Sequence, residues 1–141
     1  MLFLHPVLQL SANLLAVYVF FLGVQRFRLL HLKQKAKFDW KRHVLLGKIV
    51  LLAWPAGMLG GAGMAYITWH GFLITGTHGK TALVMLPLIF LGLISGLYMN
   101  RNKKKRTLLP LFHGVNNMVV LSLALYQVLS GWWVLNAYVF G

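Results

Sequence analysis

The sequence predicts an all-α integral membrane protein, an up-down bundle of four helices, from three observations. Of the 141 residues, 59% are hydrophobic, which is more apolar surface than a soluble domain of this size can bury. Four long apolar segments follow one another, and 12 of the 14 Lys and Arg residues lie in two stretches between them, 26–42 and 101–106. Cysteine is absent, which excludes disulfides and metal sites made of thiolates.

Each apolar segment is long enough to cross a membrane. A helix rises about 1.5 Å per residue, so about 20 residues span the hydrocarbon core of a bilayer. Pro6 suits the first turn of the first helix, whereas Pro55 and Pro87 fall inside the second and third helices, where we expect kinks. The first segment has no basic start and no cleavage site, so we interpret it as a retained span, not a signal peptide. The expected spans, within a single domain covering 1–141, are about 5–25, 43–68, 78–99 and 109–136.

The two basic loops predict the orientation of the bundle. Both lie at one end of an up-down bundle, and the positive-inside rule places loops 26–42 and 101–106 in the cytoplasm. Both termini and the short loop 70–77 then lie on the opposite side. This distribution of charge indicates contact with membrane lipid and argues against a nucleic-acid partner. Aromatic residues near the outer helix ends fit an interfacial belt: Trp69, Trp132, Trp133 and Tyr138.

Four of the six histidines occupy corresponding places, each near the N-terminal end of a different expected helix. Successive helices run in opposite directions, so two of the four fall in the outer half of the membrane and two in the inner half. Helices one and three normally lie diagonally in such a bundle, as do helices two and four. Each layer should therefore hold two imidazoles facing each other. The outer pair is His5 with His78, and the inner pair is His43 with His113.

A glycine follows each of these histidines after 18 residues, at Gly23, Gly61, Gly96 and Gly131. Eighteen residues make five helical turns, so each glycine shares a helix face with its histidine and lies about 27 Å away along the axis. The outer pair should then lie beside Gly61 and Gly131, and the inner pair beside Gly23 and Gly96. Two imidazoles and two bare helix surfaces would suit a flat macrocycle. The alternative is interfacial histidines and packing glycines, both common in membranes.

Two imidazoles per layer match the axial positions of a haem iron and favour electron transfer over oxygen chemistry. A zinc site usually adds a third ligand. Without cysteine for covalent attachment, two haems of the b type are expected. Lys41, Arg42 and the basic cluster 101–106 are candidate partners for the propionates of the inner haem. Gln9 and Asn117 follow His5 and His113 by one turn, so they either contact the ligands or cofactor, or join helices.

These features resemble the cytochrome b561 family and its prokaryotic four-helix relatives, some of them grouped as a domain of unknown function. In that family four helices hold two b haems, one near each membrane face, and pass electrons across the membrane. The resemblance implies that His5 with His78 bind one haem iron, and His43 with His113 the other. The motifs that carry it are "HPVLQ" and "GVQR", "HVLLGK", "HGKTALVMLPLIFLGLISG", and "LFHGVNN" with "YQVLSG", one group per helix.

The sequence departs from the eukaryotic members in having neither their two extra helices nor a DOMON domain or ascorbate-binding signature. A quinone or a partner redox protein is therefore expected in place of ascorbate. The predicted function is electron transfer across the membrane. The protein would be a cytochrome that works together with other redox proteins, for example as a membrane subunit of an oxidoreductase. An alternative from another class is a pigment-binding or purely structural subunit of a larger membrane complex.

Overall fold

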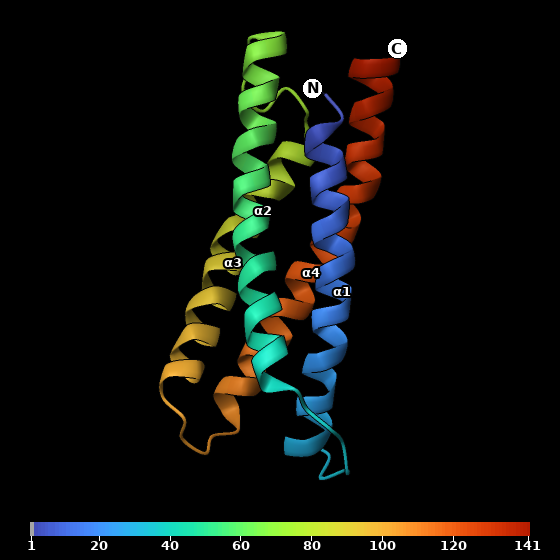
Figure 1. Ribbon diagram of the computed structural model, residues 1–141. Helices are drawn as coiled ribbons and strands as arrows, with labels where there is room; N and C mark the ends of the chain where they lie inside the picture. The colour runs from blue at the N-terminus through green and yellow to red at the C-terminus, as the bar shows by residue number, and fades with distance from the viewer. Residues whose placement is uncertain (1) are drawn as a thin grey trace.

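The computed structural model describes residues 2–141, which form four long helices joined by short loops (Figure 1). Among these residues there is no strand, so the prediction of an all-α four-helix bundle is confirmed. Each helix is long and apolar enough to cross a membrane, as expected for a multi-pass membrane protein. The elements are α1 (Leu4–Leu30), α2 (Trp40–Trp69), α3 (Thr77–Arg101) and α4 (Leu108–Leu135), followed by a π-helical turn, η1 (Asn136–Phe140).

The helices pack around the bundle in chain order. Contacts join α1 to α2, α2 to α3, α3 to α4 and α4 to α1, so α1 and α3 form one diagonal and α2 and α4 the other. Figure 1 shows both termini and the loop 70–76 at one end, which we call the aromatic end. The loops 31–39 and 102–107 lie at the other end, which we call the basic end.

The helices extend past the predicted spans mainly at the basic end. α1 continues to Leu30 and α2 begins at Trp40, so the loop between them is shorter than the predicted segment 26–42. Asp39 begins α2 as its N-cap, since its carboxylate accepts a hydrogen bond from the backbone N–H of Arg42 at 3.0 Å. That bond satisfies one of the free N–H groups of the first turn. α2 continues through Pro55, and α3 continues through Pro87.

The burial pattern is that of a protein with lipid around it. Large apolar side chains face outward, with Ile67 76% and Leu108 80% exposed. Lipid tails are as apolar as leucine, so this exposure has no cost in a bilayer. The interior instead contains small residues such as Ala12, Ala16 and Ala124, which let the helices approach closely.

A buried polar network links three helices between the two ends. The indole N–H of Trp54 donates to Oδ1 of Asn13 at 2.8 Å, and Nδ2 of Asn13 donates to the carbonyl of Ala124 at 3.1 Å. Both side chains are buried, at 5% and 6% exposure. An unpaired polar group here would be costly, so these bonds favour one relative position of α1, α2 and α4.

Candidate functional site

Two pairs of histidines face each other across the diagonals of the bundle. At the aromatic end, the ring centres of His5 on α1 and His78 on α3 lie 6.4 Å apart, with the ring planes at 89°. At the basic end, those of His43 on α2 and His113 on α4 also lie 6.4 Å apart, at 75°. The structure thus brings together the four residues in the two pairs that the helix directions predict.

The four glycines lie against the imidazoles of a neighbouring helix. A methyl group added at Gly61 would lie 2.8 Å from Cε1 of His5, closer than carbon atoms approach in proteins. At Gly23, Gly96 and Gly131 the corresponding distances, to His43, His113 and His78 in turn, are 3.3, 3.2 and 3.2 Å. Each glycine lies in the histidine layer that the sequence predicts for it. The group that each one makes room for is the edge of a histidine ring. Their direct role is to let that ring settle against the helix.

At the basic end, hydrogen bonds orient both rings. Nδ1 of His43 lies 3.2 Å from the carbonyl of Val19, which can only accept, so the proton sits on Nδ1. Nδ1 of His113 lies 2.9 Å from the hydroxyl of Ser95. That hydroxyl donates to the carbonyl of Leu91 at 2.6 Å, so its oxygen accepts the Nδ1 proton. For His43, Nε2 is then the unprotonated nitrogen, which is the form that binds a metal. The Ser95 contact gives the same form at His113, since the amide Nδ2 of Asn117, 3.2 Å from Nδ1, donates to the His113 carbonyl instead.

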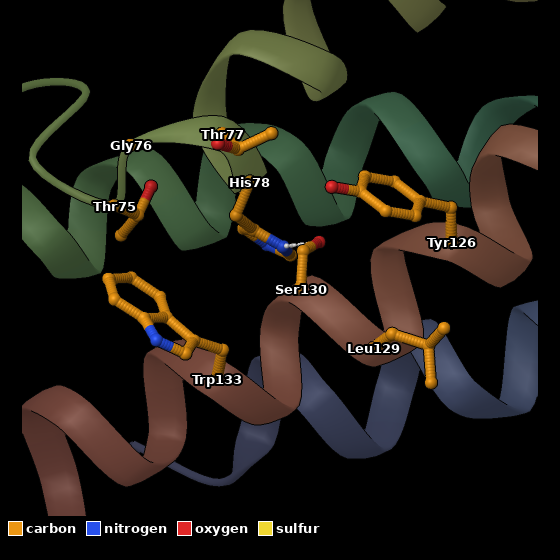
Figure 2. Close-up of a pocket in the computed structure, with 8 residues that line it drawn as sticks. All are labelled: Thr75, Gly76, Thr77, His78, Tyr126, Leu129, Ser130 and Trp133. Atoms are coloured by element: carbon orange, nitrogen blue, oxygen red, sulfur yellow. Dashed lines mark hydrogen bonds between the residues drawn. The ribbon is translucent and has the colours of Figure 1, made fainter.

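At the aromatic end, only one ring is oriented in this way. Nδ1 of His78 lies 2.9 Å from the hydroxyl of Ser130, as Figure 2 shows. The Ser130 hydroxyl donates to Oε1 of Gln127 at 2.8 Å, so it accepts the proton of His78 and leaves Nε2 free. Nδ1 of His5, by contrast, is buried and has no hydrogen-bond partner among the residues described.

Ser95 and Ser130 are functional candidates that the sequence analysis did not identify. Each immediately precedes one of the four glycines, Gly96 in α3 and Gly131 in α4. The repeated Ser-Gly dipeptide was the available signal. A serine at either position reaches the same histidine that the following glycine contacts.

Gln9 and Asn117 differ in what they contact: one joins two helices, and the other lies against a histidine. Nε2 of Gln9 donates to the carbonyl of Trp54 at 3.2 Å, so this side chain joins α1 to α2. Nδ2 of Asn117 donates to the carbonyl of His113 at 2.7 Å and lies 3.2 Å from Nδ1 of that ring. Asn117 therefore packs directly against a histidine of the basic-end pair.

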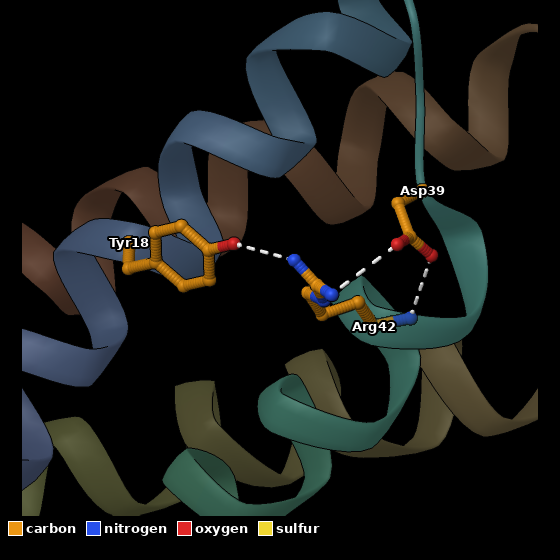
Figure 3. A network of polar contacts seen from close by, with 3 residues as sticks. All are labelled: Tyr18, Asp39 and Arg42. Atoms are coloured by element: carbon orange, nitrogen blue, oxygen red, sulfur yellow. Dashed lines mark hydrogen bonds and ion pairs between the residues drawn. The ribbon is translucent and has the colours of Figure 1, made fainter.

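Arg42 is exposed, and its contacts are with Asp39 and Tyr18 (Figure 3). Its Nε is 3.6 Å from Oδ2 of Asp39, and its Nη1 donates to the hydroxyl of Tyr18 at 3.4 Å. Arg42 is not among the residues that line the cavity beside the basic-end pair. Arg42 immediately precedes His43 in α2 and points outward where His43 points inward, so the structure does not bring Arg42 to the site.

A cavity of about 1040 Å³ opens beside the basic-end pair. His43 and His113 line it together with Gly23 and Gly96, and most of its remaining inner wall is aliphatic or aromatic. This volume is that of a site for a sizeable small molecule. Basic residues from both loops line the same cavity, namely Arg26, Lys103, Lys104, Lys105 and Arg106, with Lys48 from α2.

The aromatic end has a smaller pocket of about 380 Å³, lined by only one of the two histidines (Figure 2). His78 and Ser130 line it with Tyr126 and Trp133, and the rest of the lining is Leu129 and the segment 75–77 at the start of α3. No Lys or Arg lines this pocket. The two histidine pairs therefore share their geometry but differ in the space and charge beside them.

The chemistry available at each end is that of two imidazoles. Within residues 2–141, no three His, Cys, Asp or Glu side chains gather closely enough to hold a metal ion by themselves. In comparisons with protein-family models, with curated proteins and with solved structures, nothing matches this chain. The arrangement of the site is therefore the basis on which a function can be inferred.

Proposed function

We propose that this protein transfers electrons across a membrane through two b-type haems, one held by His5 and His78 and the other by His43 and His113. The observation that carries the proposal is the repetition of one arrangement at both ends of a transmembrane bundle. In each case two imidazoles from diagonal helices face each other with their ring centres 6.4 Å apart.

That separation fits a metal bound between the rings. Imidazole nitrogen binds first-row metals at about 2 Å and lies about 1.2 Å from its ring centre, so two rings sharing one metal have centres about 6.4 Å apart. Two rings in edge-to-face contact can also have centres about 4.5–7 Å apart, so the support comes from the same spacing recurring at both ends of the bundle. Two axial nitrogens with no third protein ligand are the set that haem iron takes in electron-transfer proteins.

The hydrogen bonds at Nδ1 also support the proposal. A histidine that binds a metal usually donates its other N–H to a carbonyl or a hydroxyl, which fixes the tautomer and the ring plane. His43, His78 and His113 have such partners in Val19, Ser130 and Ser95. Without cysteine the haems would be held only by these ligands and by packing, which makes them b-type.

The bundle supplies the surroundings that such a function needs. When bound, each haem would be held by one histidine pair and would supply a one-electron iron couple. The two pairs lie at opposite ends of helices long enough to cross a bilayer, so electrons would pass from one membrane face toward the other. By the positive-inside rule, the basic end is cytoplasmic and both termini lie on the far side.

The resemblance to the cytochrome b561 family fits this assignment, with the four histidines as iron ligands. The electron partners are a quinone or other redox-protein subunits in the membrane. A pigment-binding or structural subunit would need at most one imidazole per pigment and gives no reason for facing pairs.

The test is the absorption spectrum of the purified protein. We expect a reduced-minus-oxidised spectrum of the b type with about two haems per chain. His5→Ala and His43→Ala should each remove one haem, and a different one. His70→Asn is the control, because His70 is exposed and its left-handed backbone conformation, with φ of 54°, suits asparagine. A colourless, iron-free preparation that does not take up haem would contradict the proposal.

A further inference from the structure

We infer that the basic-end cavity is built for a ligand with a carboxylate-bearing edge, and that Arg106 and His31 hold this edge at the cavity mouth. The inference rests on the proposed function, because the ligand that it describes is haem with its two propionates. It gives a role to one residue of each basic loop whose side chain has a buried nitrogen without a hydrogen-bond partner among the described residues.

Charge is the first observation. Six cationic residues line the cavity, and no carboxylate does. The one acidic residue of the chain, Asp39, lies outside the cavity in a pair with Arg42. A cleft lined by charges of one sign attracts ligands of the opposite sign, and nothing within the protein neutralises this one. The cationic lining residues are Arg26, Lys48, Lys103, Lys104, Lys105 and Arg106.

Two unpaired nitrogens are the second observation. Nη1 of Arg106 and Nε2 of His31 are buried and have no hydrogen-bond partner among the described residues, and both side chains line the cavity. Their other contacts hold them in place. Nη2 of Arg106 donates to the carbonyl of Asn102 at 3.0 Å, and the ring of His31 stacks on Phe27 at 5.1 Å between centres. Nη1 of Arg106 is always a donor, and Nε2 of His31 is one when it carries the ring proton. Since a buried donor without an acceptor is destabilising, these groups favour a ligand that brings an acceptor.

The deep part of the cavity completes the description of the ligand. Between the cationic mouth and the polar network of the interior, apolar side chains such as Phe20, Val50 and Leu121 line it. A ligand that fits is apolar over most of its area, with negative charge along one edge. The pocket at the aromatic end has no cationic lining, so it offers no equivalent hold.

The experiment compares haem with its dimethyl ester, in which both propionates are uncharged. Each is titrated into apoprotein carrying His5→Ala, so that only the basic-end site responds, and binding is followed by absorbance. The parent protein should bind haem more tightly than the ester. Arg106→Gln should weaken haem binding about tenfold and leave ester binding unchanged. His31→Gln should act in the same direction with a smaller effect.

Arg101→Gln is the matched control. Arg101 lies on the same end of the bundle and carries the same charge, but it is exposed and does not line the cavity. Its substitution should change neither titration. Unaltered ester binding by Arg106→Gln also shows that this variant is folded.

Three results would overturn the inference. Equal binding of haem and ester by the parent protein would mean that the carboxylates are not held. An equal loss for Arg101→Gln and Arg106→Gln would assign the effect to net charge alone. Failure of the parent protein to bind either compound would overturn the proposed function as well, which separates that failure from the first two.

Discussion

The two ends of the bundle contain the same local arrangement in different surroundings. At each end a histidine pair bridges a diagonal at 6.4 Å, and each ring lies against a glycine of an adjacent helix. At the basic end both rings have a partner at Nδ1 and both line a cavity of about 1040 Å³ with cationic walls. At the aromatic end one ring lacks a partner, and the pocket is smaller and uncharged.

Under the proposed function, this difference separates the residues that would bind the iron from those that would hold the rest of the haem. The facing imidazoles depend on helix direction and on the spacing within each helix, so they recur at both ends. The cavity and its charge depend on the loops, which differ. We therefore expect the basic-end site to bind its haem more tightly than the aromatic-end site.

The largest effect is expected from adding a methyl group beside a ring. Gly61→Ala would place a carbon 2.8 Å from Cε1 of His5, a ring with no bond at Nδ1 to resist displacement. The aromatic-end haem should be lost, while the basic-end haem remains. Gly23→Ala places its carbon 3.3 Å from His43, whose ring the Val19 carbonyl holds, so it should weaken the basic-end site without emptying it. Haem content and spectra of both variants measure this contrast.

Gly60→Ala is the control for that comparison, because an added methyl group at this neighbouring position meets no atom within 4 Å. Its haem content should match that of the parent. Alanine in place of glycine within a helix should also stabilise it, by about 0.5–1 kcal/mol. If Gly60→Ala lost haem as Gly61→Ala did, contact with His5 would not be the cause.

A smaller effect is expected from removing the serine partners. Ser95→Ala and Ser130→Ala each take away the acceptor for one Nδ1 proton, at His113 and His78 in turn. Loss of such a partner typically lowers metal affinity by about 10–100-fold. Ser95→Ala should weaken only the basic-end haem and Ser130→Ala only the aromatic-end haem, as measured by haem titration. Ser122→Ala, which removes an exposed hydroxyl far from both pairs, should leave both unchanged.

Replacing the cap of α2 should give the smallest change. Asp39→Ala removes the carboxylate that accepts from the N–H of Arg42, which should lower the free energy of unfolding by about 1 kcal/mol. Its exposed ion pair with Arg42 should add little. Unfolding in detergent would report the loss, and the haem spectrum should not move. A shift of the basic-end haem would mean that Asp39 and Arg42 do act on the site.

The parts of the site that the sequence predicted are those that depend on helical period and direction. His43 faces His113 because both begin diagonal helices at the same end, and Gly23 meets His43 because it shares a face with His5 five turns earlier. Arg42 does not line the cavity, because adjacent helical residues point about 100° apart and nearness in sequence to His43 does not turn it inward.

The role of Ser95 could not be predicted from the sequence, for a different reason. Its bond to His113 joins two helices, and a hydroxyl in a membrane helix more often bonds to its own backbone, as Ser122 does with Met118. Only the packing of α3 against α4 brings the hydroxyl to the ring.

By itself the sequence determined the four membrane helices, their alternating direction and the two histidine layers, because hydropathy and helical period are properties of single segments. The tertiary structure alone decided which nitrogens are bonded, where the cavity opens and which of the basic residues near it line its wall. Those features depend on the rotation and depth of one helix against another and on the course of the loops. Arg106 and His31 are 75 positions apart in the chain, and only the folded bundle brings them to the wall of one cavity.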